Sequence, residues 1–344
     1  MRVRIVGLAS GSTFLISPSS FLIIRMLELF SIFQYCGFTM PIKISRDLPA
    51  YNTLREERVF VMTDERAEHQ DIRPLKVAIV NLMPTTLDTE IQLLRLLGNS
   101  PLQVDISFLR MGSHDSHNAP PGHLEKFYTG ADEIIKKGNR YDGFIITGAP
   151  VETLPFEEVD YWDELVALID YSKTNVWSTL HICWGAQAGL YRHYGIKKYE
   201  LPKKLFGIFP HAVNERFSPL FRGFDDEFLA PQSRETTVDR DAIAANPALT
   251  IQSETPETGV FIVTARECRE IYVSGHLEYD PLTLNREYYR DISRGHPIEI
   301  PKNYYPGNDA SKAPIVRWRA HAHLFFSNWL NYVYQDTPYN LGEL

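Results

Sequence analysis

The sequence contains few cysteines. Only Cys36, Cys183 and Cys268 occur among 344 residues. An odd number of widely spaced cysteines cannot form a disulfide framework and is typical of proteins that work in a reducing compartment. We therefore expect a cytoplasmic protein.

The sequence also lacks an excess of positive charge. It has 35 Lys and Arg residues against 43 Asp and Glu residues, which gives a formal net charge of -8. Because phosphate backbones are held by basic surfaces, this balance argues against nucleic acid as a partner. The remaining composition, 44% hydrophobic and 23% charged, is that of a globular protein and excludes a disordered or low-complexity chain.

Uninterrupted hydrophobic stretches are short. The run FLIIRMLELFSIF at residues 21–33 is interrupted by Arg25 and Glu28. A membrane-spanning helix needs about 20 apolar residues, and a secretory signal needs an unbroken apolar core with a small-residue cleavage site. We therefore expect no membrane segment. We interpret residues 1–39 as an N-terminal extension, disordered or produced by a misplaced start codon, with Met40 as the true beginning.

Strand and helix patterns alternate along the rest of the chain. Apolar runs predict strands at residues 75–82, 103–109, 141–147 and 176–182. Helical patterns follow three of them, one capped by Thr85 or Thr86 and the others at 158–171 and 185–194. This alternation predicts an α/β fold, a doubly wound, mostly parallel sheet flanked by helices.

The pattern of predicted secondary structure changes after about residue 205. Shorter strand patterns at residues 251–252, 260–264 and 270–274 and a helix at 280–290 predict a mixed sheet edge. Aromatic residues at helical spacing within 313–334 predict a C-terminal helix packed on the core. We expect residues 40–344 to form a single domain with a C-terminal β-rich and helical extension.

Cys183 follows a predicted strand and precedes a predicted helix. Ligands in open α/β sheets bind beyond the carboxyl ends of the strands. A strand-turn-helix elbow exposes a nucleophile there, and the helix N-terminus beside it favours a thiolate. The backbone N–H of Trp184 is then a candidate for the oxyanion hole. Taken alone, Cys183 could equally be a buried structural cysteine.

A second strand end supplies a candidate base. His276 follows the strand 270–274, and Glu278 lies two residues further on. A thiol nucleophile needs an imidazole base, and a carboxylate orients that imidazole. A metal site built from His181, Cys183 and His276 is the weaker alternative, because no ligand pair with zinc spacing accompanies them. We expect His114, His117, His321 and His323 to be exposed or to pack.

These motifs resemble known families. HICWGAQ and GHLEYD resemble the Cys and His-x-Glu elements of class I glutamine amidotransferases. A closer resemblance covers nearly all of residues 40–344 and is to homoserine O-acyltransferases of the MetA type. It is carried by MPIKISRDLPAYNTLREERVFVMT, RPLKVAIVNLMP, ITGAPVE, KKLFGIF, FLAPQSR, EYYRDI, PKNYYPGND and VRWRAHAHLFFSNWLNYVYQDTPY, which occur in family order.

The resemblance implies a reaction and its partners. The fold would be class I glutamine amidotransferase-like, and the enzyme would transfer acetyl from acetyl-CoA to L-homoserine for methionine biosynthesis. It implies acetyl-CoA as co-substrate, no bound cofactor, no metal and a homodimer. Cys183 resembles the acyl-thioester nucleophile, His276 the general base and Glu278 its orienting partner. Substrate-binding positions are matched by Lys204, Ser233 and Arg290.

One position of the resemblance bears on the acyl group. In the family a Gly at the position of Glu152 resembles the succinyl-CoA enzymes, and a Glu resembles the acetyl-CoA enzymes. A carboxylate there takes the space of a longer acyl chain and repels the succinyl carboxylate. Ser233 is the second position implied for acyl specificity. Thr85-Thr86 depart from the family pattern, which has a Lys after the NLMP turn, so the details of CoA binding stay open.

Three alternatives remain at this stage. A homoserine O-succinyltransferase would use the same residues with succinyl-CoA. A glutamine amidotransferase would use Cys183, His276 and Glu278 to hydrolyse glutamine, although its elbow carries a Gly where this chain has His181. A non-catalytic protein of this fold would have an unreactive Cys183.

Overall fold

The computed structural model describes residues 42–57, 61–62, 73–113 and 119–344. By its internal contacts the chain divides into two units, Met1–Thr39 and Met40–Leu344, and the described residues belong to the second. The expected N-terminal extension, residues 1–39, lies outside the described residues, as do His114 and His117.

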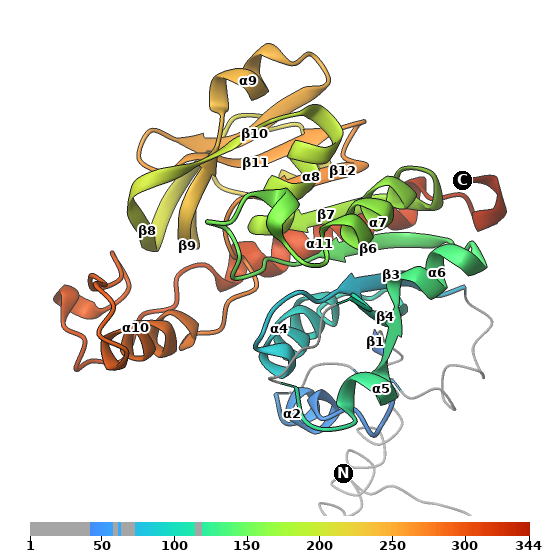
Figure 1. Ribbon diagram of the computed structural model, residues 1–344, viewed down its shortest axis with the longest axis horizontal. Coiled ribbons are helices and arrows are strands. Elements are labelled where there is room, and N and C mark those ends of the chain that lie inside the picture. Colours follow the sequence, from blue (N-terminus) through green and yellow to red (C-terminus); the bar gives the residue numbers. More distant parts are fainter. Residues whose placement is uncertain (1–41, 58–60, 63–72, 114–118) are drawn as a thin grey trace, which may run out of the picture. The chain divides into compact units, whose positions relative to one another are not determined.

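One sheet organises the described residues (Figure 1). Its parallel half has the order β2 (Val61–Met62), β1 (Ile42–Lys43), β4 (Val104–Arg110), β3 (Leu75–Val80), β6 (Tyr141–Ile146), β7 (Val176–Ile182) and β12 (Glu270–Val273), with β5 (Tyr128–Gly130) beside β4. The antiparallel half continues with β11 (Gly259–Ala265), β10 (Leu249–Thr255), β8 (Lys198–Val213) and β9 (Glu227–Val238). The predicted mixed sheet edge is therefore confirmed.

Helices cover both faces of the parallel strands, because successive side chains of a strand point to opposite faces. On β3, Val77 and Ile79 pack on the face of α2 (Ala50–Glu56), α4 (Thr86–Leu97) and α11 (Arg319–Asp336). Ala78 and Val80 pack on the opposite face, with α6 (Ala131–Lys137), α7 (Trp162–Asn175) and α8 (Trp184–Tyr194). The remaining helices are α5 (His123–Phe127), α9 (Arg240–Ala245) and α10 (Thr283–Ser293), with 3₁₀ turns at Phe156–Glu158, Pro219–Phe221, Pro306–Asn308 and Leu341–Glu343. The expected doubly wound arrangement is confirmed.

Some predicted boundaries are wrong by a few residues. The helix predicted from residue 158 begins at Trp162, since Pro155 opens a 3₁₀ turn that ends at the extended Val159. The helix predicted from residue 280 begins at Thr283, because Asp280 N–H donates to Thr283 Oγ1 and residues 280–282 form a turn. Thr85 stands at the N-cap of α4, but its side chain makes no capping hydrogen bond.

The long hairpin of β8 and β9 was not predicted. Its residues alternate poorly between buried and exposed, and Pro202 and Pro231 lie within the two strands. Proline lacks the N–H of a ladder hydrogen bond and normally marks an interruption, so the pattern did not favour strands here. The C-terminal aromatics behave as expected, since Phe325, Phe326 and Trp329 of α11 are buried in the core.

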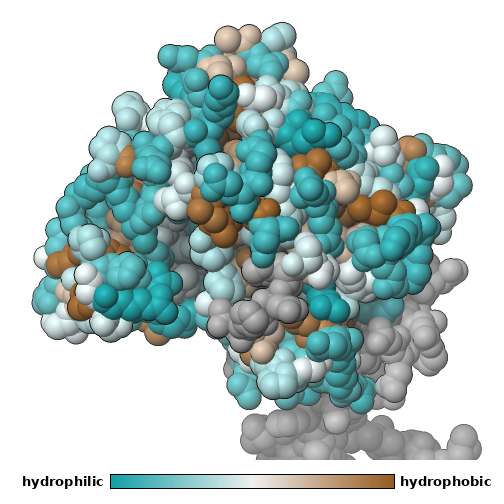
Figure 2. Space-filling view, viewed as in Figure 1, coloured by the Kyte–Doolittle hydropathy of each residue, from teal (hydrophilic) through white to brown (hydrophobic). Residues whose placement is uncertain are grey.

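The surface is mainly hydrophilic on the face that Figure 2 shows, where hydrophobic side chains form small, separate groups. None of the helices in the described residues has both the length and the apolar character that a membrane crossing requires.

Candidate active site

Cys183 occupies a strained turn between β7 and α8. Its backbone has φ 52° and ψ -117°, a conformation that residues with a side chain rarely adopt. The Cys183 N–H donates to the carbonyl of Val273 at 2.7 Å, which ties the turn to the end of β12. Strain of about 1–3 kcal/mol at such a residue is characteristic of functional positions. The geometry is that of a nucleophile elbow.

The start of α8 packs directly on the end of β6. A Cβ at Gly185 would lie 2.6 Å from the carbonyl oxygen of Thr147, so this position requires glycine. The close approach brings the first turn of α8 to the carboxyl edge of the parallel strands. The N–H groups of a first helical turn have no carbonyl acceptor within the helix. The Trp184 N–H, next to the nucleophile, can therefore donate to an oxyanion.

His276 and Glu278 form the second half of the site. Nδ1 of His276 lies 2.6 Å from Oε1 of Glu278, and both residues are buried. Cys183 lies close enough to His276 to raise the pKa of the imidazole. Because Nδ1 interacts with the Glu278 carboxylate, the other ring nitrogen, Nε2, is the one that can exchange a proton with the thiol. The structure thus brings a thiol, an imidazole and a carboxylate together at one edge of the sheet, the set of groups that a nucleophile, a general base and an orienting partner require.

The charges around His276 favour its protonated form. Burial alone would lower the pKa of His276, but the negative charges of Cys183 and Glu278 outweigh burial and raise that pKa well above its usual value. Protonated His276 next to Cys183 stabilises a thiolate. A cationic imidazole beside a sulfur atom is the general arrangement that favours nucleophilic attack by sulfur.

Tyr279 lies against the base. Its ring stacks on that of His276 with centroids 4.0 Å apart and planes 14° apart. The Trp318 indole N–H donates to the Tyr279 carbonyl at 3.0 Å and holds this segment. Burial raises the pKa of Tyr279 well above 10, and the charges of Glu287 and Glu278 add to the rise. The stack fixes the plane of the imidazole.

The three sequence-predicted substrate residues meet around one carboxylate. Oε1 of Glu287 accepts from Lys204 Nζ at 2.6 Å and from Ser233 Oγ at 2.7 Å. Arg290 lies one helical turn further along α10, with its Nη2 3.8 Å from Glu287 Oε1, and its Nε donates to Asp291. The guanidinium of Arg290 is half exposed and can reach a ligand. Sequence reasoning missed Glu287, although its spacing of three residues from Arg290 was an available signal.

Glu152 lies on the loop after β6. Its Oε2 accepts from both the N–H and the hydroxyl of Thr236 on β9, at 3.1 and 2.9 Å. Burial lowers the pKa of Arg234, and the charges of Cys183 and Glu152 act in the opposite direction, so both groups lie within electrostatic reach of that guanidinium. Gly148, on the same loop, was also missed. A Cβ there would lie 3.7 Å from Cys183 Sγ and 3.6 Å from His276 Cε1, so its lack of a side chain leaves space beside both groups.

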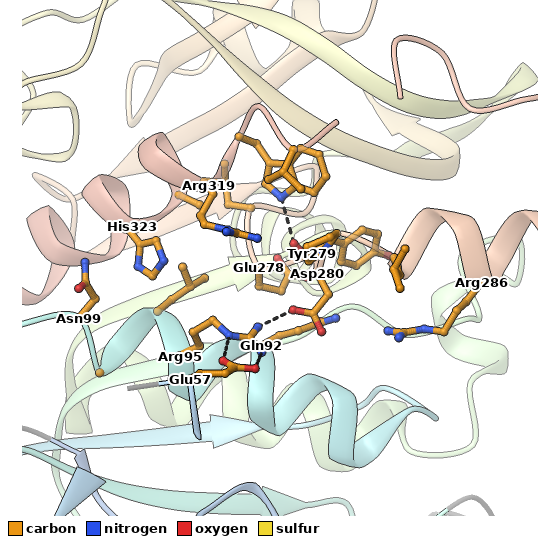
Figure 3. Close-up of a pocket in the computed structure, with 18 residues that line it drawn as sticks. Glu57, Gln92, Arg95, Asn99, Glu278, Tyr279, Asp280, Arg286, Arg319 and His323 are labelled. Carbon is orange, nitrogen blue, oxygen red and sulfur yellow. Dashed lines mark hydrogen bonds and ion pairs between the residues drawn. The ribbon is translucent and has the colours of Figure 1, made fainter. Parts of the chain in front are cut away.

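A cavity of about 650 Å³ lies against the segment that carries Glu278 (Figure 3). Arg95 of α4 lines the cavity and forms ion pairs with Glu57 and Asp280. His323, expected to be exposed or to pack, lies on its wall. Among the described residues that line the cavity are Glu278 and Tyr279, which contact His276, whereas Cys183 and His276 are not among them. The ion pair of Arg95 with Asp280 ties α4 to the segment that follows Glu278.

His181 does not take part in the site. It is fully buried and stacks on Tyr272 with centroids 4.8 Å apart. Burial lowers the pKa of His181 to about 3, which keeps it neutral. In the part of the chain that the structure describes, no group of three His, Cys, Asp or Glu side chains could hold a metal ion. His321 packs on Phe224, with ring centroids 5.0 Å apart.

Comparison with solved structures defines the class of fold. A glutamine amidotransferase from Thermotoga maritima matches with a TM-score of 0.52 at 14% identity, over 76% of this chain and 99% of that one. A similarity at 14% identity shows a shared fold and says nothing about a shared activity. The expected class I glutamine amidotransferase-like fold is confirmed.

Comparison of sequences defines the family. A family model described as homoserine O-succinyltransferase matches residues 41–339. The homoserine O-acetyltransferase of Clostridium acetobutylicum is 59% identical over 303 residues, 88% of this chain and 100% of that protein. The homoserine O-acetyltransferase of Petrotoga mobilis is 56% identical over 306 residues, 89% of this chain and 98% of that protein. The chain belongs to the homoserine O-succinyltransferase family, whose members include enzymes named for acetyl transfer.

Proposed function

We propose that the protein is a homoserine O-acetyltransferase, which moves the acetyl group of acetyl-CoA to the side-chain hydroxyl of L-homoserine. The strained Cys183 beside the His276–Glu278 pair carries the reaction type, because it is the arrangement that acyl transfer through a thioester needs. The relatives named homoserine O-acetyltransferase, at 56–59% identity, support the substrates.

In the first half-reaction the Cys183 thiolate attacks the thioester carbon of acetyl-CoA. The Trp184 N–H stabilises the oxyanion that forms. The carbon–sulfur bond to CoA then breaks, and protonated His276 gives its proton to the departing CoA thiolate. The products are free CoA, an acetyl thioester on Cys183 and a neutral imidazole.

In the second half-reaction neutral His276 takes the proton of the homoserine hydroxyl, and the oxygen attacks the acetyl carbon. The Cys183 thiolate leaves, and the original ion pair with protonated His276 is restored. Glu278 keeps the imidazole oriented through both steps. O-acetyl-L-homoserine is the product.

The cluster around Glu287 is suited to the polar end of homoserine. Arg290 can bind the carboxylate bidentately, and the Glu287 carboxylate can receive the ammonium group. Ser233 and Lys204 hold Glu287 in place. Such a site places the homoserine hydroxyl by fixing the two charged groups at the other end of the molecule.

Glu152 supports acetyl over succinyl transfer. A carboxylate in the acyl pocket leaves less space and repels a second carboxylate. The alternative, a homoserine O-succinyltransferase, uses the same fold and the same thiol.

The free cysteines bear on the compartment, and the family resemblance bears on the assembly. The described cysteines, Cys183 and Cys268, are both free, which fits a reducing compartment such as the cytoplasm. A homodimer is what the family resemblance implies, and sedimentation of the purified protein tests it.

The test is the product of the purified protein with L-homoserine and either acetyl-CoA or succinyl-CoA. We expect CoA release and a product with the mass of O-acetylhomoserine, with acetyl-CoA strongly preferred. Preference for succinyl-CoA would be consistent with the same mechanism but would contradict the proposal that acetyl-CoA is the donor. Transfer from neither donor, combined with glutamine hydrolysis, would favour an amidotransferase.

A further inference from the structure

The loop that carries Glu152 is held at two points by the hairpin of β8 and β9. Lys198 of β8 donates from Nζ to the carbonyl oxygens of Glu152 and Leu154, the second at 2.6 Å. Thr236 of β9 donates to the Glu152 carboxylate from its backbone N–H and from its hydroxyl. The main chain and the side chain of Glu152 are therefore fixed by different residues of the same hairpin.

The hydroxyl of Thr236 has one hydrogen to donate. Glu152 Oε2 lies 2.9 Å from Oγ1, and Gln187 Oε1 lies 3.0 Å from it. The charged carboxylate is the stronger acceptor. Gln187 Nε2 donates to Oγ1 at 2.9 Å, which satisfies the hydroxyl as an acceptor and turns its hydrogen toward Glu152. Thr236 and Gln187 are both buried, so water does not replace these bonds cheaply.

The hydrogen bonds that link Glu152, Thr236 and Gln187 continue to Cys183. Gln187 lies in the first turn of α8, and its backbone N–H donates to the Cys183 carbonyl at 3.2 Å. The Glu152 carboxylate is thus positioned relative to the same helix that presents the thiol. Discrimination between acyl groups needs that carboxylate at a fixed distance from the reacting carbon, because a mobile side chain could move aside for a longer acyl chain.

We propose that Thr236, supported by Gln187, is a specificity-determining positioning residue that locks Glu152 in the acyl pocket. The proposal rests on the proposed function, in which Glu152 selects acetyl-CoA. Thr236 does not touch the reacting atoms. Its effect is expected in the choice of donor more than in the rate with acetyl-CoA.

The experiment compares kcat/KM for acetyl-CoA and succinyl-CoA, with L-homoserine as acceptor, in Thr236→Val and in the parent protein. Loss of a buried hydrogen bond to a charged group is expected to lower the acetyl preference by about tenfold. Thr236→Ser keeps the hydroxyl and should keep the preference. Thr237→Val, the same change at the next residue of β9, is the matched control and should also keep it.

A Glu152→Gly variant separates the two hypotheses. If Glu152→Gly raises succinyl-CoA use and folded Thr236→Val leaves the preference unchanged, the role of Thr236 is wrong and the proposed function stands. If Glu152→Gly also leaves the preference for acetyl-CoA unchanged, the proposal that Glu152 selects the acyl group is wrong. In the Glu152→Gly background, Thr236→Val should have no further effect, and an equal effect in both backgrounds would contradict the coupling.

Discussion

Replacing Gly148 with alanine would fill the space between the nucleophile and the base. The added Cβ would lie 3.2 Å from Cys183 Cβ, 3.7 Å from its Sγ and 3.6 Å from His276 Cε1. The shortest of these is below the contact of about 3.5–4.0 Å that carbon atoms prefer, so neighbouring atoms must shift by a few tenths of an ångström. An acyl carbon must come within about 3–3.5 Å of the sulfur to react, and the methyl group would crowd that approach.

We expect Gly148→Ala to lower kcat/KM for acetyl-CoA about 100-fold, because small misplacements of reacting groups have effects of that size. The unfolding free energy should fall by only about 1–3 kcal/mol, the usual effect of one extra methyl in a packed region. Steady-state kinetics and urea unfolding measure the two quantities. Gly112→Ala is the control, since its Cβ would meet only Glu164, at 3.6 Å. Activity of Gly148→Ala within a few-fold of the parent would refute this reading of the site.

Three further changes test other parts of the account. Glu278→Gln removes a charge that raises the pKa of His276, so the high-pH limb of kcat/KM for acetyl-CoA should move to lower pH, and an unmoved limb would contradict the pairing. His276→Asn should keep the thermal melting profile while acetylation and deacylation in rapid-quench experiments both slow by about 100-fold or more, as expected for loss of a general acid and base. Arg95→Met removes the bridge between Glu57 and Asp280 and should cost about 2 kcal/mol of unfolding free energy, measured in urea, whereas an unchanged midpoint would show that the bridge contributes nothing.

Strands β3, β6 and β7 of the parallel half could be predicted because nearly all of their residues are buried, on both faces of the sheet. Such strands are continuous apolar runs, and β7 was predicted with both of its ends, Val176 and Ile182, as the structure has them. The β8 and β9 hairpin could not be found in this way. Its residues are partly exposed and include Pro202 and Pro231, and long-range pairing holds it together.

In the candidate site, too, some residues could be predicted from the sequence pattern and others could not. Cys183 and His276 follow strands, so their meeting at one edge of the sheet could be predicted from the pattern. The family resemblance was needed for Lys204 and Ser233, because nothing local distinguishes them from surface residues. The role of Glu287 as their common partner depends on α10 folding back toward β8 and β9, and no local pattern contains that contact.

The most direct measurement is the intact mass of the protein after incubation with acetyl-CoA alone, followed by addition of L-homoserine. The account predicts a gain of one acetyl group, located by peptide mapping on Cys183, which disappears as O-acetylhomoserine forms, and no gain in Cys183→Ala. An active protein that never gains the acetyl group, or that gains it on another residue and transfers it with Cys183 replaced, would contradict the account.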